Sequence, residues 1–136
     1  MAAAATWAAA LFFPALRADD QVIQSIEVLA FGWIGPLLGG YFEWLANPFL
    51  ILAALLTIIG IRNVWVVAAL GIFEGGLLIR NATLTSFPAN EAGNYVIQVR
   101  YLGWYLWMAA QGIMLLALAL SLFEHIRSAR AATDPG

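Results

Sequence analysis

The longest uncharged stretch of the sequence runs from Tyr101 to Phe123 and leaves the chain few ways to fold. As an α-helix it would be about 34 Å long, enough to cross the apolar part of a bilayer. The rest of the chain offers little polar cover, because 63% of all residues are apolar and only 10% are charged. A water-soluble domain needs more polar surface than that. We therefore expect an all-α integral membrane protein in a single domain of 136 residues.

Three further apolar stretches are bounded by charged, Pro or Gly residues, and we expect each to form a membrane helix. Together they predict a compact bundle of four transmembrane helices at residues 2–16, 48–61, 64–79 and 101–123. The first is short for a span, so a peripheral Ala-rich tail is the alternative there. Asn47 and Pro48 favour a helix start, because Asn can cap the helix and Pro is tolerated in its first turn. The two residues 62–63 predict a tight antiparallel hairpin between the second and third helices.

Between the first two helices, residues 28–46 are apolar but are interrupted by Gly32, Gly35 and Pro36. Broken backbone is tolerated at membrane depth only where protein or water satisfies its polar groups. We therefore predict an interfacial or re-entrant segment here, with a continuous fifth span as the alternative. Residues 81–100 are more polar and predict an outer loop, and the small polar residues 131–136 predict a mobile tail.

Aromatic residues gather in the broken segment and at the start of the last helix. Rings that are apolar on one side and wet on the other suit the headgroup layer of a membrane. We therefore predict an interfacial belt, and a ligand-stacking group at the start of the last helix is the alternative. The belt would consist of Trp33, Trp44, Tyr101, Trp104, Tyr105 and Trp107.

Glu74 is the only acidic residue inside a predicted span, and Gln111 is the only amide deep in the last helix. A carboxyl group inside a membrane usually faces other helices and takes a partner or a proton. Gln111, an inward-reaching Arg80 or Arg100, and a second protomer are the candidate partners. Gly71 and Gly75 form a GxxxG pattern, which predicts close helix packing beside Glu74. Helix packing, proton or ion handling, and a subunit interface all remain open roles for Glu74.

Several classes of function are excluded by what the sequence lacks. There is no cysteine and only one histidine, which leaves no Cys-based redox or metal site, and we expect no metal and no cofactor. The few basic residues form no patch for nucleic acid. The motifs of serine hydrolases, zinc proteases, P-loop proteins and dinucleotide-binding proteins are missing, so we expect no enzyme. A lipid-facing enzyme using Asp19, Asp20 or Glu43 is the lesser alternative.

The predicted helices are short for a bilayer, and association with other chains is one way to accommodate that. We therefore expect an accessory, assembly or sensor component that packs against itself as a homo-oligomer or against a larger membrane protein complex. The alternative is a homo-oligomeric proton- or ion-linked transporter or channel that uses Glu74. The composition is rich in Ala and Arg and contains no Lys, which favours a bacterial inner membrane. We expect both termini in the cytoplasm.

Overall fold

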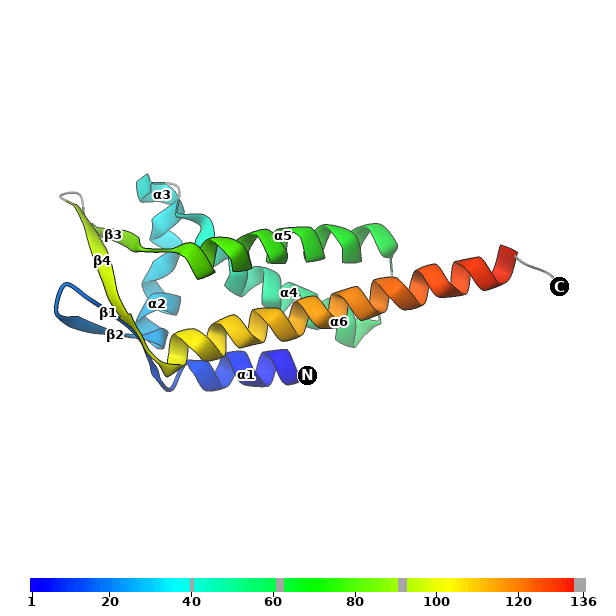
Figure 1. The fold of residues 1–136 in the computed structure, drawn as a ribbon, viewed down its shortest axis with the longest axis horizontal. Helices are drawn as coiled ribbons and strands as arrows, with labels where there is room; N and C mark the ends of the chain where they lie inside the picture. The colour runs from blue at the N-terminus through cyan, green and yellow to red at the C-terminus, as the bar shows by residue number, and fades with distance from the viewer. Residues whose placement is uncertain (40, 61–62, 91–92, 134–136) are drawn as a thin grey trace.

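The computed structural model describes residues 1–39, 41–60, 63–90 and 93–133. Long helices lie side by side along the long axis of the molecule, and a small β-sheet lies at one end (Figure 1). The α-helices are α1 (Ala2–Ala10), α2 (Ser25–Phe31), α3 (Gly35–Gly39), α4 (Ala46–Ile59), α5 (Val64–Thr83) and α6 (Leu102–Thr133). The strands are β1 (Pro14–Ala18), β2 (Gln21–Gln24), β3 (Ser86–Asn90) and β4 (Gly93–Arg100). Two 3₁₀ helices are η1 (Gly32–Ile34) and η2 (Phe42–Leu45).

Three helical stretches are long and apolar enough to cross a membrane by length and composition: Phe42–Ile59, Val64–Thr83 and Leu102–Ala131. The predicted bundle of four transmembrane helices is not confirmed, because α1 has only nine residues and rises about 13 Å. The predicted helix at 2–16 is wrong beyond Ala10. Pro14 cannot donate a helical hydrogen bond, and the chain continues from it as strand β1.

A four-stranded antiparallel sheet in the order β2-β1-β4-β3 contradicts the all-α prediction. The prediction of a loop at 81–100 is also wrong, because its described residues complete α5 and form β3 and β4. Its position outside the membrane stays a prediction. The segment Tyr95–Val99 is rich in aromatic and β-branched residues, which is a strand signal that an argument from polarity alone overlooks. The sheet brings the N-terminal hairpin beside residues about 80 positions later in the chain.

Asp19 and Asp20 form the turn of the β1–β2 hairpin, with φ angles of 45° and 66°. Positive φ at both central residues defines a type I′ turn, and Asp tolerates this conformation better than most residues. The Arg17 Nη2 atom lies 2.7 Å from Asp20 Oδ1 and steadies the turn. This acidic pair therefore has a structural explanation.

The long helices differ from the predicted ranges mainly at their ends. Helix α4 ends where Gly60 adopts a φ of 79°, which glycine allows without strain. Helix α5 begins with the Asn63 side chain accepting hydrogen bonds from two backbone N–H groups, and it continues to Thr83 rather than residue 79. Helix α6 runs to Thr133, so residues 131–133 are helical, whereas residues 134–136 lie outside the described residues.

The broken segment at 28–46 contains parts of α2 and α4 with η1, α3 and η2 between them. No continuous fifth span forms in its described residues, as its Gly and Pro content predicts. The Trp44 indole N–H donates to the Leu29 carbonyl at 2.9 Å and folds the segment back on itself. Gly32 is required for this fold, since a Cβ there would collide with the Trp44 ring. The location of the segment 28–46 at a membrane surface stays a prediction.

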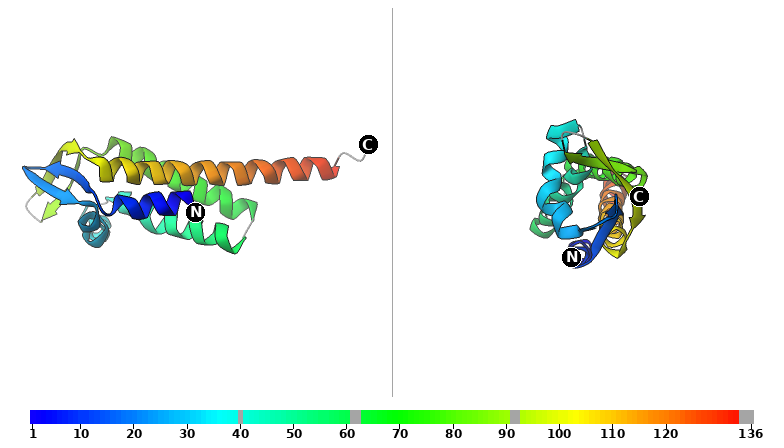
Figure 2. Two further views of the ribbon diagram at one scale, coloured as in Figure 1. Left: turned by 90° about the horizontal axis from the view of Figure 1, so that it is seen from below. Right: turned by 90° about the vertical axis from the view of Figure 1, so that its left-hand side faces the viewer.

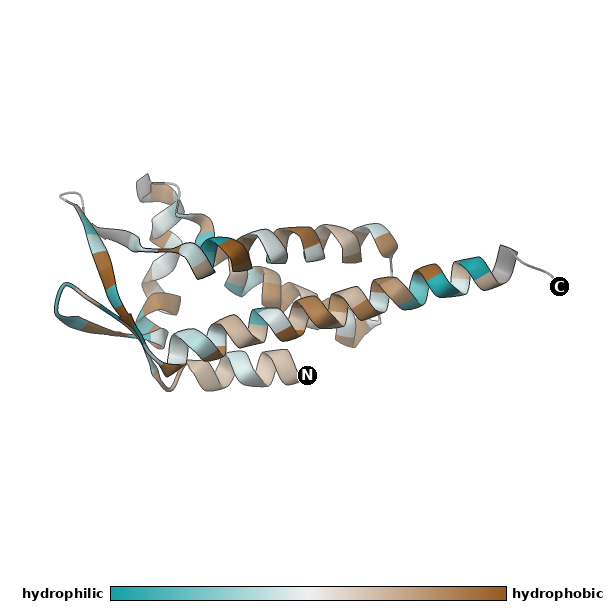
Figure 3. Cartoon of the chain, viewed as in Figure 1, coloured by the Kyte–Doolittle hydropathy of each residue, from teal (hydrophilic) through white to brown (hydrophobic). Residues whose placement is uncertain are grey.

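Two apolar clusters form the core. The proximal cluster lies beside the sheet and consists of Ala10, Ala15, Leu16, Ala18, Ala46, Leu77, Trp104 and Trp107. The distal cluster lies further along the helices and consists of Ala3, Leu50, Ala53, Val67, Leu70, Ala110, Met114 and Leu118. Viewed from the sheet end, α2 and α3 lie on one side and the strands on the other (Figure 2). Polar residues concentrate in the sheet and near the end of α6, whereas the middle of the helices is apolar (Figure 3).

Candidate functional site

Three polar side chains lie between the two apolar clusters of the helices, and all three are buried. They are Asn47 on α4, Glu74 on α5 and Gln111 on α6, with exposed fractions of 5%, 1% and 0%. Along each helix, the polar residue stands between a residue of the proximal cluster and one of the distal cluster: Ala46 and Leu50, Leu77 and Leu70, Trp107 and Met114. We call these three residues the polar layer.

Both polar atoms of the Asn47 side chain make hydrogen bonds. Its Oδ1 atom accepts from the indole N–H of Trp7 at 2.8 Å and from that of Trp107 at 3.0 Å. Its Nδ2 atom donates to the Trp44 carbonyl at 3.0 Å. One amide thus joins α1, η2, α4 and α6. The sequence predicted Asn47 as a helix cap, which is wrong because α4 begins at Ala46 with Leu45 as its N-cap.

Gln111 is held from the last turns of α5. Its Oε1 atom accepts a hydrogen bond of 3.3 Å from the Asn81 Nδ2 atom. Asn81 is fully buried, although the sequence placed it at the start of an outer loop. Its position seven residues after Glu74 puts both on the same face of α5, and this spacing could have identified it. Both amides keep one buried polar atom without a hydrogen-bond partner among the described residues.

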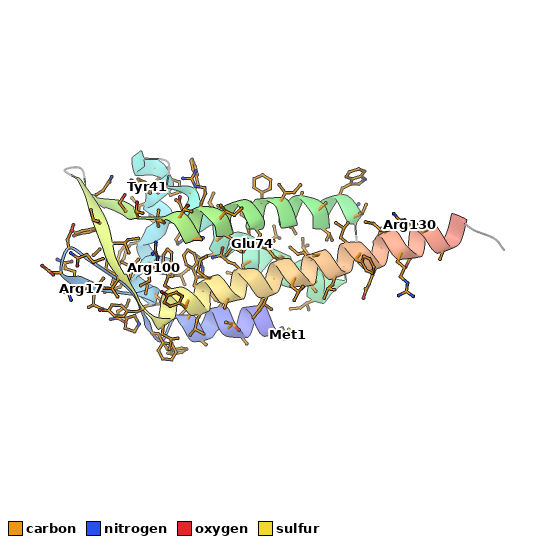
Figure 4. The ribbon with its side chains drawn as sticks, viewed as in Figure 1. Met1, Arg17, Tyr41, Glu74, Arg100 and Arg130 are labelled. Carbon is orange, nitrogen blue, oxygen red and sulfur yellow. The ribbon has the colours of Figure 1, made fainter. Side chains whose placement is uncertain are left out.

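Glu74 lies inside the bundle (Figure 4), and neither carboxyl oxygen has a hydrogen-bond partner in the described part of the chain. Of its predicted partners within the chain, the two arginines are engaged elsewhere, and the Gln111 Nε2 donor makes no hydrogen bond to it. The Arg80 Nη2 atom lies 2.8 Å from Glu43 Oε1, and Gln111 bonds to Asn81. Arg100 donates to the Leu84 carbonyl and stacks over the Trp104 ring at 5.5 Å.

An unpartnered carboxylate in apolar surroundings costs several kcal/mol, whereas a neutral carboxylic acid costs far less. The buried position of Glu74 is therefore chemically suited to holding a proton. It is equally suited to receiving a hydrogen-bond donor from another molecule. In the described chain Glu74 thus bonds to none of the partners that the sequence suggested, and its predicted roles stay predictions.

Gly71 and Gly75 do not create close helix packing within the described chain. A Cβ at Gly71 would meet no neighbouring atom within 4 Å, and one at Gly75 would meet only Leu115, at an ordinary 3.9 Å. No other described helix therefore fills the space at Gly71, whereas Gly75 faces Leu115 of α6. Their predicted role in helix packing stays a prediction that now requires a second chain.

The six residues of the predicted aromatic belt differ in exposure. Trp33 and Tyr105 are 50% and 60% exposed, as a belt requires. Trp104 and Trp107 are buried in the proximal cluster and meet edge to face, with ring centroids 5.4 Å apart. The prediction that these two residues belong to the belt is wrong, since they pack inside the protein. The remaining two, Trp44 and Tyr101, are half-buried.

The described residues contain no group of three or more His, Cys, Asp or Glu side chains that could hold a metal ion. A comparison of the chain with protein-family models, with curated proteins and with solved structures finds no match. The fold itself defines a class. It is a mostly helical protein with three helices that can span a membrane by length and composition, and with a small sheet at one end.

Proposed function

We propose that the protein is a small membrane component that acts through helix–helix association, as an accessory, assembly or sensor subunit. Its partner would be a second copy of itself or a larger membrane protein. The observation that carries the proposal is the open space at Gly71, inside a helix long and apolar enough to span a membrane. The proposal includes that the protein is not an enzyme.

Glycine inside a helix costs about 1 kcal/mol relative to alanine, and nothing in the described chain makes use of the small size of Gly71. In lipid, association depends on close van der Waals packing, and glycines four residues apart let two helices approach closely. A helix from another chain seated on this flank of α5 would use both Gly71 and Gly75. This argument supports association rather than an isolated monomer.

The test compares Gly71→Leu with Gly76→Leu in lipid nanodiscs. Both glycines have open space around them, so neither substitution should disturb the fold of the chain. Gly76 lies on a different side of α5, which makes it a matched control. We expect Gly71→Leu to weaken association at least tenfold, measured by cross-linking yield against protein density. Equal association of the two variants would exclude this flank of α5.

A second candidate function is favoured by the unpartnered carboxyl of Glu74. A homo-oligomeric proton- or ion-linked transporter or channel would need a buried group that binds and releases a proton, and Glu74 is suited to that. Three helices long enough to span a membrane do not enclose a pathway alone, so several copies would be required. For this role, Glu74→Gln should abolish flux into proteoliposomes while leaving the oligomer intact. Unchanged flux would eliminate the proton-handling role.

We further propose a bacterial inner membrane with both termini in the cytoplasm. The start of α1 and the end of α6 point away from the sheet (Figure 1), so the sheet would then face the periplasm. The chain has no cysteine, which permits clean single-cysteine labelling. An impermeant maleimide should label Gln98→Cys in intact cells but label Ser128→Cys only after lysis, since both positions are exposed. The reverse pattern would invert the orientation.

A further inference from the structure

A cavity of about 340 Å³ lies between the sheet and the helices, and neither Glu74 nor Gln111 is part of its wall. Strands β1, β2 and β4, the segment from α2 to η2, the end of α5 and the start of α6 all contribute to its wall. Much of that wall is aromatic. The rings belong to Phe31, Tyr41, Trp44, Tyr95, Trp104 and Trp107. Its volume falls within the range of about 300–1,000 Å³ that small-molecule sites occupy.

Two hydrogen-bond acceptors in this wall have no partner among the described residues: Glu43 Oε2 and Asn81 Oδ1. Both side chains are more than nine-tenths buried, with exposed fractions of 6% and 0% for the residues. The other polar atom of each is engaged. Glu43 Oε1 accepts from Arg80, and Asn81 Nδ2 donates to Gln111. An unsatisfied buried acceptor costs about 1–3 kcal/mol, so the wall is chemically complete only with a hydrogen-bond donor in the cavity.

The charges around the cavity favour an uncharged donor. Arg80 compensates Glu43, and the other carboxylate of the wall, Glu27, accepts from the Gln24 backbone N–H at 2.7 Å. Arg100 stacks over the Trp104 ring and is not part of the wall. A bound anion would face two carboxylates. A bound ammonium would find Glu43 already neutralised by Arg80 and Glu27 exposed, where solvent screens its charge.

We infer that this cavity binds an uncharged amphiphile with a hydroxyl-bearing head and an apolar body. The hydroxyl group donates to Glu43 Oε2 or Asn81 Oδ1, and the apolar body packs against the aromatic wall. Such a molecule comes either from the bilayer, as a monoacylglycerol, or from solution, as a long-chain alcohol. The inference goes beyond the proposed function, because it concerns a different surface from the α5 glycines.

The test measures binding of radiolabelled dodecanol to the full chain in nanodiscs, relative to empty nanodiscs, with dodecanoate and dodecylammonium as chain-matched probes. We expect saturable dodecanol binding at one molecule per chain, at least tenfold tighter than that of either charged probe. Competition by monooleoylglycerol would show that the bound amphiphile comes from the bilayer. If monooleoylglycerol does not compete, the amphiphile is an alcohol taken from solution. Tighter binding of a charged probe, or no excess over empty nanodiscs, would overturn the inference.

Two variants of α2 locate the site. Val28 lies in the cavity wall, whereas Ile26 on the same helix is 50% exposed and lies outside it. Val28→Trp should fill part of the cavity and weaken dodecanol binding at least tenfold, while Ile26→Trp should leave it within twofold. Equal binding by the two variants would place any alcohol site elsewhere. If Val28→Trp fails to fold, the preference of the unmodified chain among the three probes still decides the inference.

Discussion

The sheet end of the molecule (residues 14–45 and 84–101) and its helical region (residues 46–83 and 102–133) treat polar groups differently. At the sheet end, three of the acidic side chains have partners. Arg17 pairs with Asp20, Glu27 bonds to the start of α2, and Glu43 pairs with Arg80 from the end of α5. In the helical region, burial of polar groups is concentrated in the polar layer and Asn81.

Within the polar layer the contrast is sharper. Asn47 makes hydrogen bonds to three tryptophans, whereas Glu74, equally buried, makes none among the described residues. An amide satisfied in this way stabilises the bundle. A carboxyl without a partner does not, because its desolvation is not offset. The comparison indicates that Asn47 stabilises the fold through its hydrogen bonds and that Glu74 makes no such contribution among the described residues.

The largest effect is expected for Asn47→Leu, which would leave the indole N–H groups of Trp7 and Trp107 without their acceptor. Each unsatisfied donor costs about 1–3 kcal/mol, so the free energy of unfolding should fall by about 3 kcal/mol. Reversible unfolding in mixed micelles measures it. Thr57→Val is the control, since Thr57 bonds only to its own helix and should change stability by less than about 0.5 kcal/mol. Equal effects would contradict the role assigned to Asn47.

A smaller loss is expected for Gly103→Ala, where the sheet end meets α6. The added Cβ would lie 2.6 Å from the Pro14 carbonyl oxygen and 2.7 Å from that of Phe13. Backbone atoms cannot easily give way, so the substitution should cost about 1–3 kcal/mol in the same unfolding measurement. Gly112→Ala on the same helix has open space and should be neutral or stabilising by up to about 1 kcal/mol. A neutral Gly103→Ala would mean that the two regions are not tightly joined there.

Glu74→Leu should raise the free energy of unfolding by about 1 kcal/mol, because it removes a buried polar group that has no partner in the described chain. Glu74→Gln keeps the size and polarity and is the control, with little change expected. Unfolding of the monomer in mixed micelles provides the comparison. A loss of stability in Glu74→Leu would reveal a partner for the carboxyl and would remove the contrast with Asn47.

The smallest effect is expected at the β1–β2 turn. Asp19 has a φ of 45°, a conformation that glycine adopts more readily than Asp. Asp19→Gly should therefore stabilise the hairpin by about 0.5 kcal/mol, visible as slower amide hydrogen exchange in β1 and β2. Ala18 precedes the turn and is fully buried, so Ala18→Gly should accelerate exchange instead. Faster exchange in Asp19→Gly would show that the Asp side chain itself holds the turn.

Hydropathy predicted the long helices because a long run of apolar residues is favourable as a helix both in lipid and in a protein core. Helices α5 and α6 contain the predicted ranges except for Tyr101, which lies just before α6. The same argument failed at residues 2–16, where Ala-rich composition hid the effect of Pro14, and at 81–100, where polarity was interpreted as a loop. A strand that pairs with residues 80 positions away depends on tertiary contacts that local composition does not encode.

The sequence identified Glu74 and Gln111 as buried polar residues, and both are buried. It did not identify Asn47 and Asn81 as their companions, because an Asn near a helix end usually serves as a cap or lies in a turn. Here the tryptophans of α1 and α6 provide donors for Asn47, and only the packed structure brings them together. The cavity was likewise invisible, since its wall combines residues from Leu16 to Trp107.

The central claim, association through α5, is tested most directly by native mass spectrometry of the tagged protein extracted gently into lipid particles. The account predicts either a defined homo-oligomer or a stoichiometric complex with a second membrane protein, and loss of that species in Gly71→Leu but not in Gly76→Leu. A single chain surrounded only by lipid, at every protein density tested, would contradict it.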